Sequence, residues 1–344
     1  MRQIHNNLIK HLAVVLIIFS NLSFGKEFNE LFTIYQPIEN TSKIEQSINL
    51  SFNNMVYRLS GDNSPSNIWK IINSGTSRKD LIISYSVKNI EGLSYLQVKF
   101  NQDMLVTKFK ELAIPIIGYS RPVILFLFEV DSGSDQPYFI SSNKGIHDMD
   151  EVFKKMLNTF SKERGIFLEL PIFDLEDTKK ISSFNILADP KSYIASMYDY
   201  HKLVHIKISN LGLNQWLLSG DINVNFESSN FVADIEEIFI SFLSPFIDES
   251  LAEFQIQTSS ESFAYISIKG INTHEDYIEL NKKMTMILSI PDLEIISFSD
   301  NTITYKAATY GSVESILKEI ESNGFLDILD NEKDSDSINL YYKK

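Results

Sequence analysis

An unbroken apolar segment at residues 123–130 (VILFLFEV) restricts the possible folds more than any other part of the chain. Its first six residues are all apolar, which is typical of a strand buried on both faces, as in a parallel sheet. A helical pattern of apolar residues follows, and residues 166–173 (IFLELPIF) are typical of a second strand. The order strand, helix, strand predicts a β-α-β unit with two parallel strands.

The rest of the chain divides into units on either side of this pattern. Residues 26–118 predict an α+β unit, and residues 119–253 a central α/β unit with an open sheet around the parallel β-α-β core. Residues 254–344 have the order β-α-β-β-α-β, which is the ferredoxin-like pattern. The predicted fold class is therefore α+β or α/β, with three consecutive units.

Two details of strand pairing follow from the same patterns. In the last unit, a strand over residues 254–268 should share a sheet with a strand over residues 337–342. In the central unit, residues 215–226 are predicted to form one strand.

The first 25 residues have the pattern of a cleavable export signal. Arg2 and Lys10 precede and flank an eight-residue apolar segment, and small residues stand before a cut at Lys26. That apolar segment is far shorter than the roughly 20 residues of a membrane span, although an uncleaved anchor is the alternative. We therefore expect an exported, periplasmic protein without a transmembrane segment after cleavage.

Charge and cysteine content exclude several classes of protein. The formal net charge is −14, and an acidic surface repels phosphate groups, so nucleic acid is not an expected partner. The chain has no cysteine, which excludes disulfide scaffolds, thiolate catalysis and cysteine-ligated metals. Stability must therefore come from packing of the core.

Three segments taken together resemble one bacterial family. They are residues 58–62 (RLSGD), 121–126 (RPVILF) and 164–177 (RGIFLELPIFDLED). Their order and spacing resemble the exported proteins catalogued as domain of unknown function two-thousand-sixty-six, over most of the chain. The segment departs from the family after its apolar pair, where relatives often carry Trp and this chain has Phe128. The resemblance implies a proteobacterial envelope protein and assigns no activity.

The same segments contain three arginines, in a chain with only five arginines among 31 basic residues. They are Arg58, Arg121 and Arg164, and the last two are expected at the N-terminal ends of the parallel strands. The planar guanidinium can make a structural contact to backbone carbonyls or a carboxylate, or it can bind a ligand carboxylate or phosphate. Gly165 should have a positive φ, because the helix before it must end within one residue of a buried strand.

Acidic residues follow both parallel strands, and parallel strands bring their carboxyl ends to one edge of the sheet. Asp131 and Asp135 follow the first strand, and Asp174, Glu176 and Asp177 follow the second. One interpretation is a site for a hard cation such as Ca²⁺ or Mg²⁺. The other is turn chemistry and helix capping, in which Asp174 or Asp177 accepts backbone N–H bonds.

No motif in the chain identifies a reaction. There is no Gly-x-Ser-x-Gly elbow, phosphate-binding loop or dinucleotide fingerprint. His201 and His205 are expected on one strand about 13 Å apart, too far to share a metal ion. The sequence therefore assigns no catalytic, cofactor-binding or metal-binding residue.

These patterns favour a non-enzymatic interaction or assembly factor whose partner is another envelope protein. Open sheets in series offer edges to which a partner strand can be added. The alternative is a carboxylate-based, metal-assisted hydrolase with its site at Asp174, Glu176 and Asp177.

Overall fold

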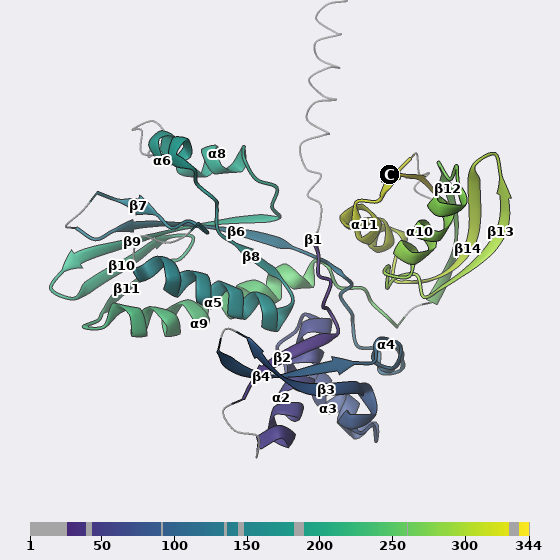
Figure 1. The fold of residues 1–344 in the computed structure, drawn as a ribbon, viewed down its shortest axis with the longest axis horizontal. Helices are drawn as coiled ribbons and strands as arrows, with labels where there is room; N and C mark the ends of the chain where they lie inside the picture. Colours follow the sequence, from purple (N-terminus) through teal and green to yellow (C-terminus); the bar gives the residue numbers. More distant parts are fainter. Residues whose placement is uncertain are drawn as a thin grey trace, which may run out of the picture.

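The computed structural model (Figure 1) describes residues 26–38, 43–90, 92–133, 136–143, 148–181, 189–259, 261–329 and 337–343. The expected export signal and Asp135 lie outside these residues. The described chain is a mixed α+β protein whose sheets include parallel strand pairs, as the sequence predicts.

The first unit has a three-stranded antiparallel sheet with the strand order β2-β4-β3. The helix α2 lies against β2 and β4, because apolar residues at helical spacing, from Ile48 to Leu59, are fully buried on one of its faces. The strand β3 is left at the edge of the sheet. The elements are β2 (Thr33–Pro37), α2 (Ile44–Ser60), α3 (Ser66–Asn73), the 3₁₀-helix η2 (Arg78–Leu81), β3 (Ile82–Ile90), β4 (Leu93–Phe100) and α4 (Gln102–Glu111).

The central unit is a sheet with helices on both faces (Figure 1). Strand β6 pairs in parallel with β9 and β8, which confirms the predicted parallel strands. Alternate residues of β6 enter two different cores, with Phe126 and Phe128 facing α5 and α9 and Leu127 facing α6 and α8. The elements are β5 (Ser120–Arg121), β6 (Val123–Asp131), β7 (Tyr138–Phe139), α5 (Asp148–Arg164), β8 (Phe167–Glu169), α6 (Leu175–Ile181), α8 (Pro190–Ala195), β9 (Lys202–Gly212), β10 (Gln215–Gly220), β11 (Val224–Glu227) and α9 (Phe231–Ala252).

Two predicted strands of the central unit differ in the structure. The expected single strand over residues 215–226 is wrong: the chain turns after Gly220, and β10 pairs with β11 as a hairpin. Gly220 has φ +104° and lies so close to the His205 carbonyl that a side chain would not fit. The strand expected over residues 166–173 ends at Glu169, since Pro171 has no N–H to donate to a ladder.

The C-terminal unit has a five-stranded sheet with the order β13-β14-β12-β16-β15. Its elements follow the predicted β-α-β-β-α-β order, with β15 added before the last strand. As predicted, the last strand shares a sheet with the first, although β15 reverses the chain so that β16 runs parallel to β12. The elements are β12 (Glu261–Lys269), α10 (His274–Met284), β13 (Asp292–Ser299), β14 (Thr302–Tyr310), α11 (Val313–Asn323), β15 (Leu326–Ile328) and β16 (Ser337–Tyr342).

Residues 254–259 connect the units instead of beginning the strand expected from residue 254. Ile256 pairs with Ile116 in an isolated bridge, and the Thr258 hydroxyl donates to the carbonyl of Ile114 at 2.9 Å. Leu288 and Tyr310 of the C-terminal unit enter the hydrophobic core of the first unit. The strand β1 (Lys26–Glu27) pairs with β5 at the same junction.

Candidate functional site

Arg58, at the end of α2, joins the first unit to the central unit. Its guanidinium is buried, and Nη1 donates to the carbonyls of Thr33 at 2.7 Å and Leu31 at 3.2 Å. Its Nε and Nη2 donate to the carbonyls of Glu163 and Lys162, in the last turn of α5. Burial lowers the pKa of Arg58 to about 9, so the group remains charged at neutral pH. A cation is favourable there because the last carbonyls of α5 carry partial negative charge.

Arg121 is fully buried next to this contact. Its Nη1 donates to the carbonyl of Arg58 at 2.8 Å, which is among the last carbonyls of α2. Its Nη2 and Nε donate to the carbonyls of Ile117 and Gly118 at 2.9 and 2.7 Å. Burial lowers the pKa of Arg121, and the charges of Arg58 and Arg164 lower it further. The three arginines, far apart in the sequence, therefore form one cluster.

Arg164 and Gly165 complete the arginine cluster. Arg164 pairs with Asp248 of α9 at 2.5 Å and donates to the Gly61 carbonyl at 3.2 Å. Gly165 has φ +61°, as predicted. A Cβ at this position would lie 2.7 Å from Cγ of Arg58, so a larger residue would displace the Arg58 side chain. Each arginine donates to backbone carbonyls. Of the two predicted roles, a structural contact or the binding of a ligand anion, this is the structural contact.

Glu319 brings α11 of the C-terminal unit to the cluster. It is buried and accepts backbone N–H bonds from Leu288 and Ser289, both at 3.0 Å. A Cβ on Gly118 would lie 2.2 Å from Glu319 Oε1, so a larger residue would displace the Glu319 carboxylate from its present position. Burial raises the pKa of Glu319, whereas its hydrogen bonds and the charge of Arg121 lower it. The sequence offered no signal for Glu319, which follows an ordinary helical pattern.

The acidic residues of the second candidate site cap a helix. Asp174 accepts N–H bonds from Glu176 and Asp177 at 2.7 Å, at the start of α6, as the capping interpretation predicts. Asp177 accepts in return from the Asp174 N–H at 3.3 Å, and Glu176 pairs with Lys180. Asp131 accepts an N–H bond from Gly133 in a turn.

The described residues contain no group of three or more His, Cys, Asp or Glu side chains that could hold a metal ion. The two histidines have separate surroundings. His201 accepts an N–H bond from Val123 through Nδ1, and His205 faces Glu129 at 3.5 Å. Among the described residues, the predicted acids Asp131, Asp174, Glu176 and Asp177 therefore do not belong to such a group of three or more.

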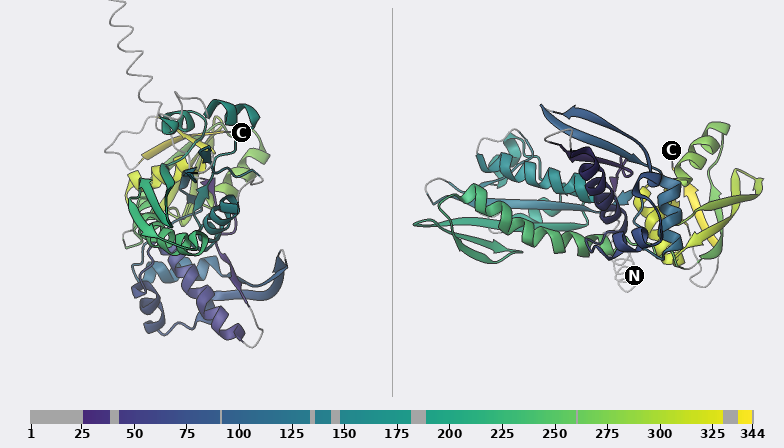
Figure 2. Two further views of the ribbon diagram at one scale, coloured as in Figure 1. Left: turned by 90° about the vertical axis from the view of Figure 1, so that its left-hand side faces the viewer. Right: turned by 90° about the horizontal axis from the view of Figure 1, so that it is seen from below.

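Two long edge strands expose apolar residues that the sequence analysis did not single out. On β3, Tyr85 and Val87 are 54% and 49% exposed, and on β13, Ile296 and Phe298 are 52% and 58% exposed. Figure 2 shows the β3–β4 hairpin projecting from the side of the first unit. Alternation with Ser is the signal that could have identified them, but alternation alone does not show whether a strand lies at an edge.

Comparisons with known proteins return no relatives. No family model, no curated protein and no solved structure matches the chain. Within the described ranges, no helix is both long enough and apolar enough to cross a membrane.

Proposed function

We propose that the chain is an exported cell-envelope protein that acts as a non-enzymatic interaction or assembly factor, with another envelope protein as its partner. The signal pattern before Lys26 supports export, and the three motif segments support kinship with the uncharacterised envelope family that they resemble. The observation that carries the interaction role is the pair of long, apolar edge strands β3 and β13.

An edge strand with unpaired backbone groups is a template for pairing with another strand, and proteins limit such pairing with short edges, charged residues, Pro or β-bulges. The edges of the central sheet are short, since β11, β7 and β8 have four, two and three residues. By contrast, β3 and β13 have nine and eight residues. The only charged residue of β3 is Lys88, and the charged residues of β13 lie in its first half. The register shifts once in each strand, between Ile82 and Ser84 in β3 and between Ile295 and Ser297 in β13. The regular part of each strand is suited to accept a partner strand.

The metal-assisted hydrolase is the second candidate. Its three carboxylates are occupied with capping α6 and with a surface ion pair. No specific observation in the described part of the chain favours it.

The interaction role can be tested by co-purification from envelope extracts. Lysine in the middle of an edge strand opposes strand addition, so Val87→Lys on β3 and Ile296→Lys on β13 are the variants. We expect the parent to retain a defined envelope protein after cross-linking, identified by mass spectrometry. At least one of the two edge variants should lose it.

The matched control is Leu213→Lys, which places the same charge in an exposed hairpin turn where Leu213 is 95% exposed. This variant should retain the partner. If the parent and all three variants retain the same proteins, the edge strands do not carry an interaction and the proposal fails.

A further inference from the structure

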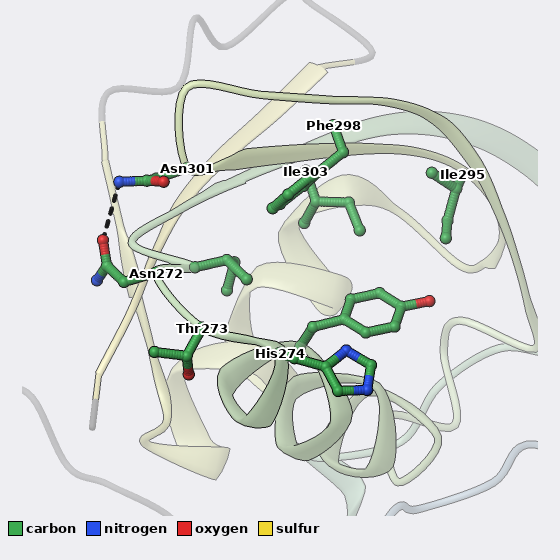
Figure 3. Close-up of a pocket in the computed structure, with 9 residues that line it drawn as sticks. Asn272, Thr273, His274, Ile295, Phe298, Asn301 and Ile303 are labelled. Carbon is green, nitrogen blue, oxygen red and sulfur yellow. Dashed lines mark hydrogen bonds between the residues drawn. The ribbon is translucent and has the colours of Figure 1, made fainter.

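The C-terminal unit has an apolar groove at the edge of its sheet, between β13 and α10 (Figure 3). Ile295 pairs with Tyr305 and Phe298 pairs with Ile303. Tyr305 and Ile303 are buried in the core, so Ile295 and Phe298 lie on the side of the sheet that the helices cover. They nevertheless remain 48% and 58% exposed, so the helices leave the edge of this face uncovered.

The opposite wall of the groove comes from the first turn of α10. Figure 3 shows Ile295, Phe298 and Ile303 pointing from the hairpin toward the ring of His274. Asn301 donates to Asn272 at 2.9 Å and closes one end. The volume is about 460 Å³, which is enough for a large apolar side chain.

The backbone beside the groove is open. Within the described residues, β13 pairs only with β14, and the register shifts between Ile295 and Ser297. On either side of this irregularity, the outer N–H and C=O groups of β13 face away from the sheet. Such an edge binds an extended segment by main-chain hydrogen bonds, while a neighbouring groove selects a side chain. An extended peptide uses both features at once, whereas a small molecule would use only the groove.

The charged residues around the groove indicate the net charge of the peptide that it would bind. Residues 292–301 contain Asp292, Glu294 and Asp300 and no Lys or Arg, and α10 adds Glu275 in its first turn. Asp300 and Glu275 are next in sequence to the groove residues Asn301 and His274, whereas Asp292 and Glu294 lie on the opposite face of the edge strand, with Glu294 opposite Lys306. A segment with basic residues on either side of its apolar anchor complements this rim.

In the described part of the first unit, the pocket that the structure shows does not adjoin the edge strand β3. This pocket is lined by residues of η2 and α4, such as Leu81 and Met104, and by neighbouring residues, and not by Tyr85 or Val87. The groove at β13, by contrast, adjoins a long free edge.

We propose that β13 binds an extended basic segment of a partner protein as an added strand, with one large apolar side chain inserted between Phe298 and His274. This inference rests on the proposed interaction role and specifies its binding mode.

The test uses the mature chain and labelled eleven-residue peptides in fluorescence polarisation. The peptides alternate Thr with Val, carry Lys near both ends, and have Phe, Leu, Ile, Val or Ser at the centre. We expect tighter binding with a central Phe or Leu than with Ser. Replacing Lys by Glu should weaken binding at least tenfold at low salt. Only alternate residues of an added strand form hydrogen bonds with the edge strand. N-methylation of peptide residues in one alternating set should therefore abolish binding, whereas N-methylation in the other set should not.

The matched variants are Phe298→Ala in the groove and Phe263→Ala on the opposite face of the same sheet, where Phe263 is 61% exposed. Phe298→Ala should weaken binding at least tenfold, and Phe263→Ala by less than twofold. Circular dichroism confirms that both variants are folded. Equal loss in both variants, or equal binding by the Phe and Ser peptides, would overturn the inference. If none of the peptides binds while the Ile296→Lys variant still loses its envelope partner, the interaction role stands and this binding mode is wrong.

Discussion

Gly165 is the residue at which backbone conformation and side-chain packing are coupled most tightly. Its φ is +61°, and a Cβ there would lie 2.7 Å from the Arg58 side chain. We predict that Gly165→Ala lowers the free energy of unfolding by more than the roughly 1–2 kcal/mol expected from the left-handed backbone alone. Urea unfolding of the mature chain measures this difference.

Gly75 supplies the control for the backbone effect. Its φ is +82°, but a Cβ there would meet no atom within 4 Å. Gly75→Ala should therefore show only the conformational effect. If the two alanine variants are destabilised equally, Arg58 adjusts freely and the steric argument is wrong.

Arg121 and Glu319 are buried ionisable residues whose effects on the free energy of unfolding should be coupled. Breaking a buried charge interaction by removing one partner typically costs about 3–5 kcal/mol. We predict a loss of this order for Arg121→Met, since the carbonyls of Arg58, Ile117 and Gly118 also lose their donor. The double variant Arg121→Met/Glu319→Gln should lose less than the sum of the two single changes. Strict additivity in urea unfolding would show that the two charges are not coupled.

At the scale of elements, the stability that the Asp174 cap gives to α6 should depend on pH. The N–H groups of Asp177 and Glu176 donate to Asp174 and lower its pKa. A carboxyl group with a lowered pKa stabilises the fold above its unfolded value, about 3.9, and this contribution is lost as the pH falls through the folded pKa. Asn caps helices as well as Asp does but does not titrate.

We therefore predict that Asp174→Asn melts like the parent at pH 7 and loses less stability than the parent below about pH 4. Thermal melts at several pH values measure the difference. Addition of Ca²⁺ or Mg²⁺ should change neither protein, because Asp174 acts as a cap. A strong rise in the melting temperature of the parent alone would support a cation site instead.

Elements defined by local patterns were predictable, and contacts between elements were not. The burial of β6 on both faces and the positive φ of Gly165 follow from residues near them in sequence. The β10–β11 hairpin is not evident from the sequence because apolar residues continue past Gly220. The strand β15 is not evident because three residues are too few to show an alternating pattern. The partners of Arg121 are carbonyl groups, which every residue has, so the sequence does not show which ones are bound.

At the scale of the whole molecule, Arg58 should make the first and central units unfold together. We predict that Arg58→Met separates one calorimetric transition into two, because it removes the donor to Glu163 and Lys162 of α5. Arg78→Met is the control, since Arg78 lies over Phe52 within the first unit. Two resolved transitions in the parent would contradict the prediction.

The mature N-terminus is a second prediction at this scale. Export with cleavage before Lys26 would leave β1 at the very start of the chain, paired with β5 beside Arg121. Mass spectrometry of the protein from the periplasmic fraction should therefore find Lys26 as the first residue. Recovery of the uncleaved chain from the cytoplasm would contradict both cleavage and export.

The arginine cluster also affects the order in which the chain can complete its structure during synthesis. The ribosome releases the first unit before the central unit, yet Arg58 needs carbonyl groups that lie 104 and 105 residues later. Until α5 has been made, the guanidinium at the end of α2 has only its contacts near Leu31 and Thr33. The first unit therefore lacks the contacts of Arg58 with α5 until about half of the chain has been made, and its core is complete only after Leu288 and Tyr310 have followed.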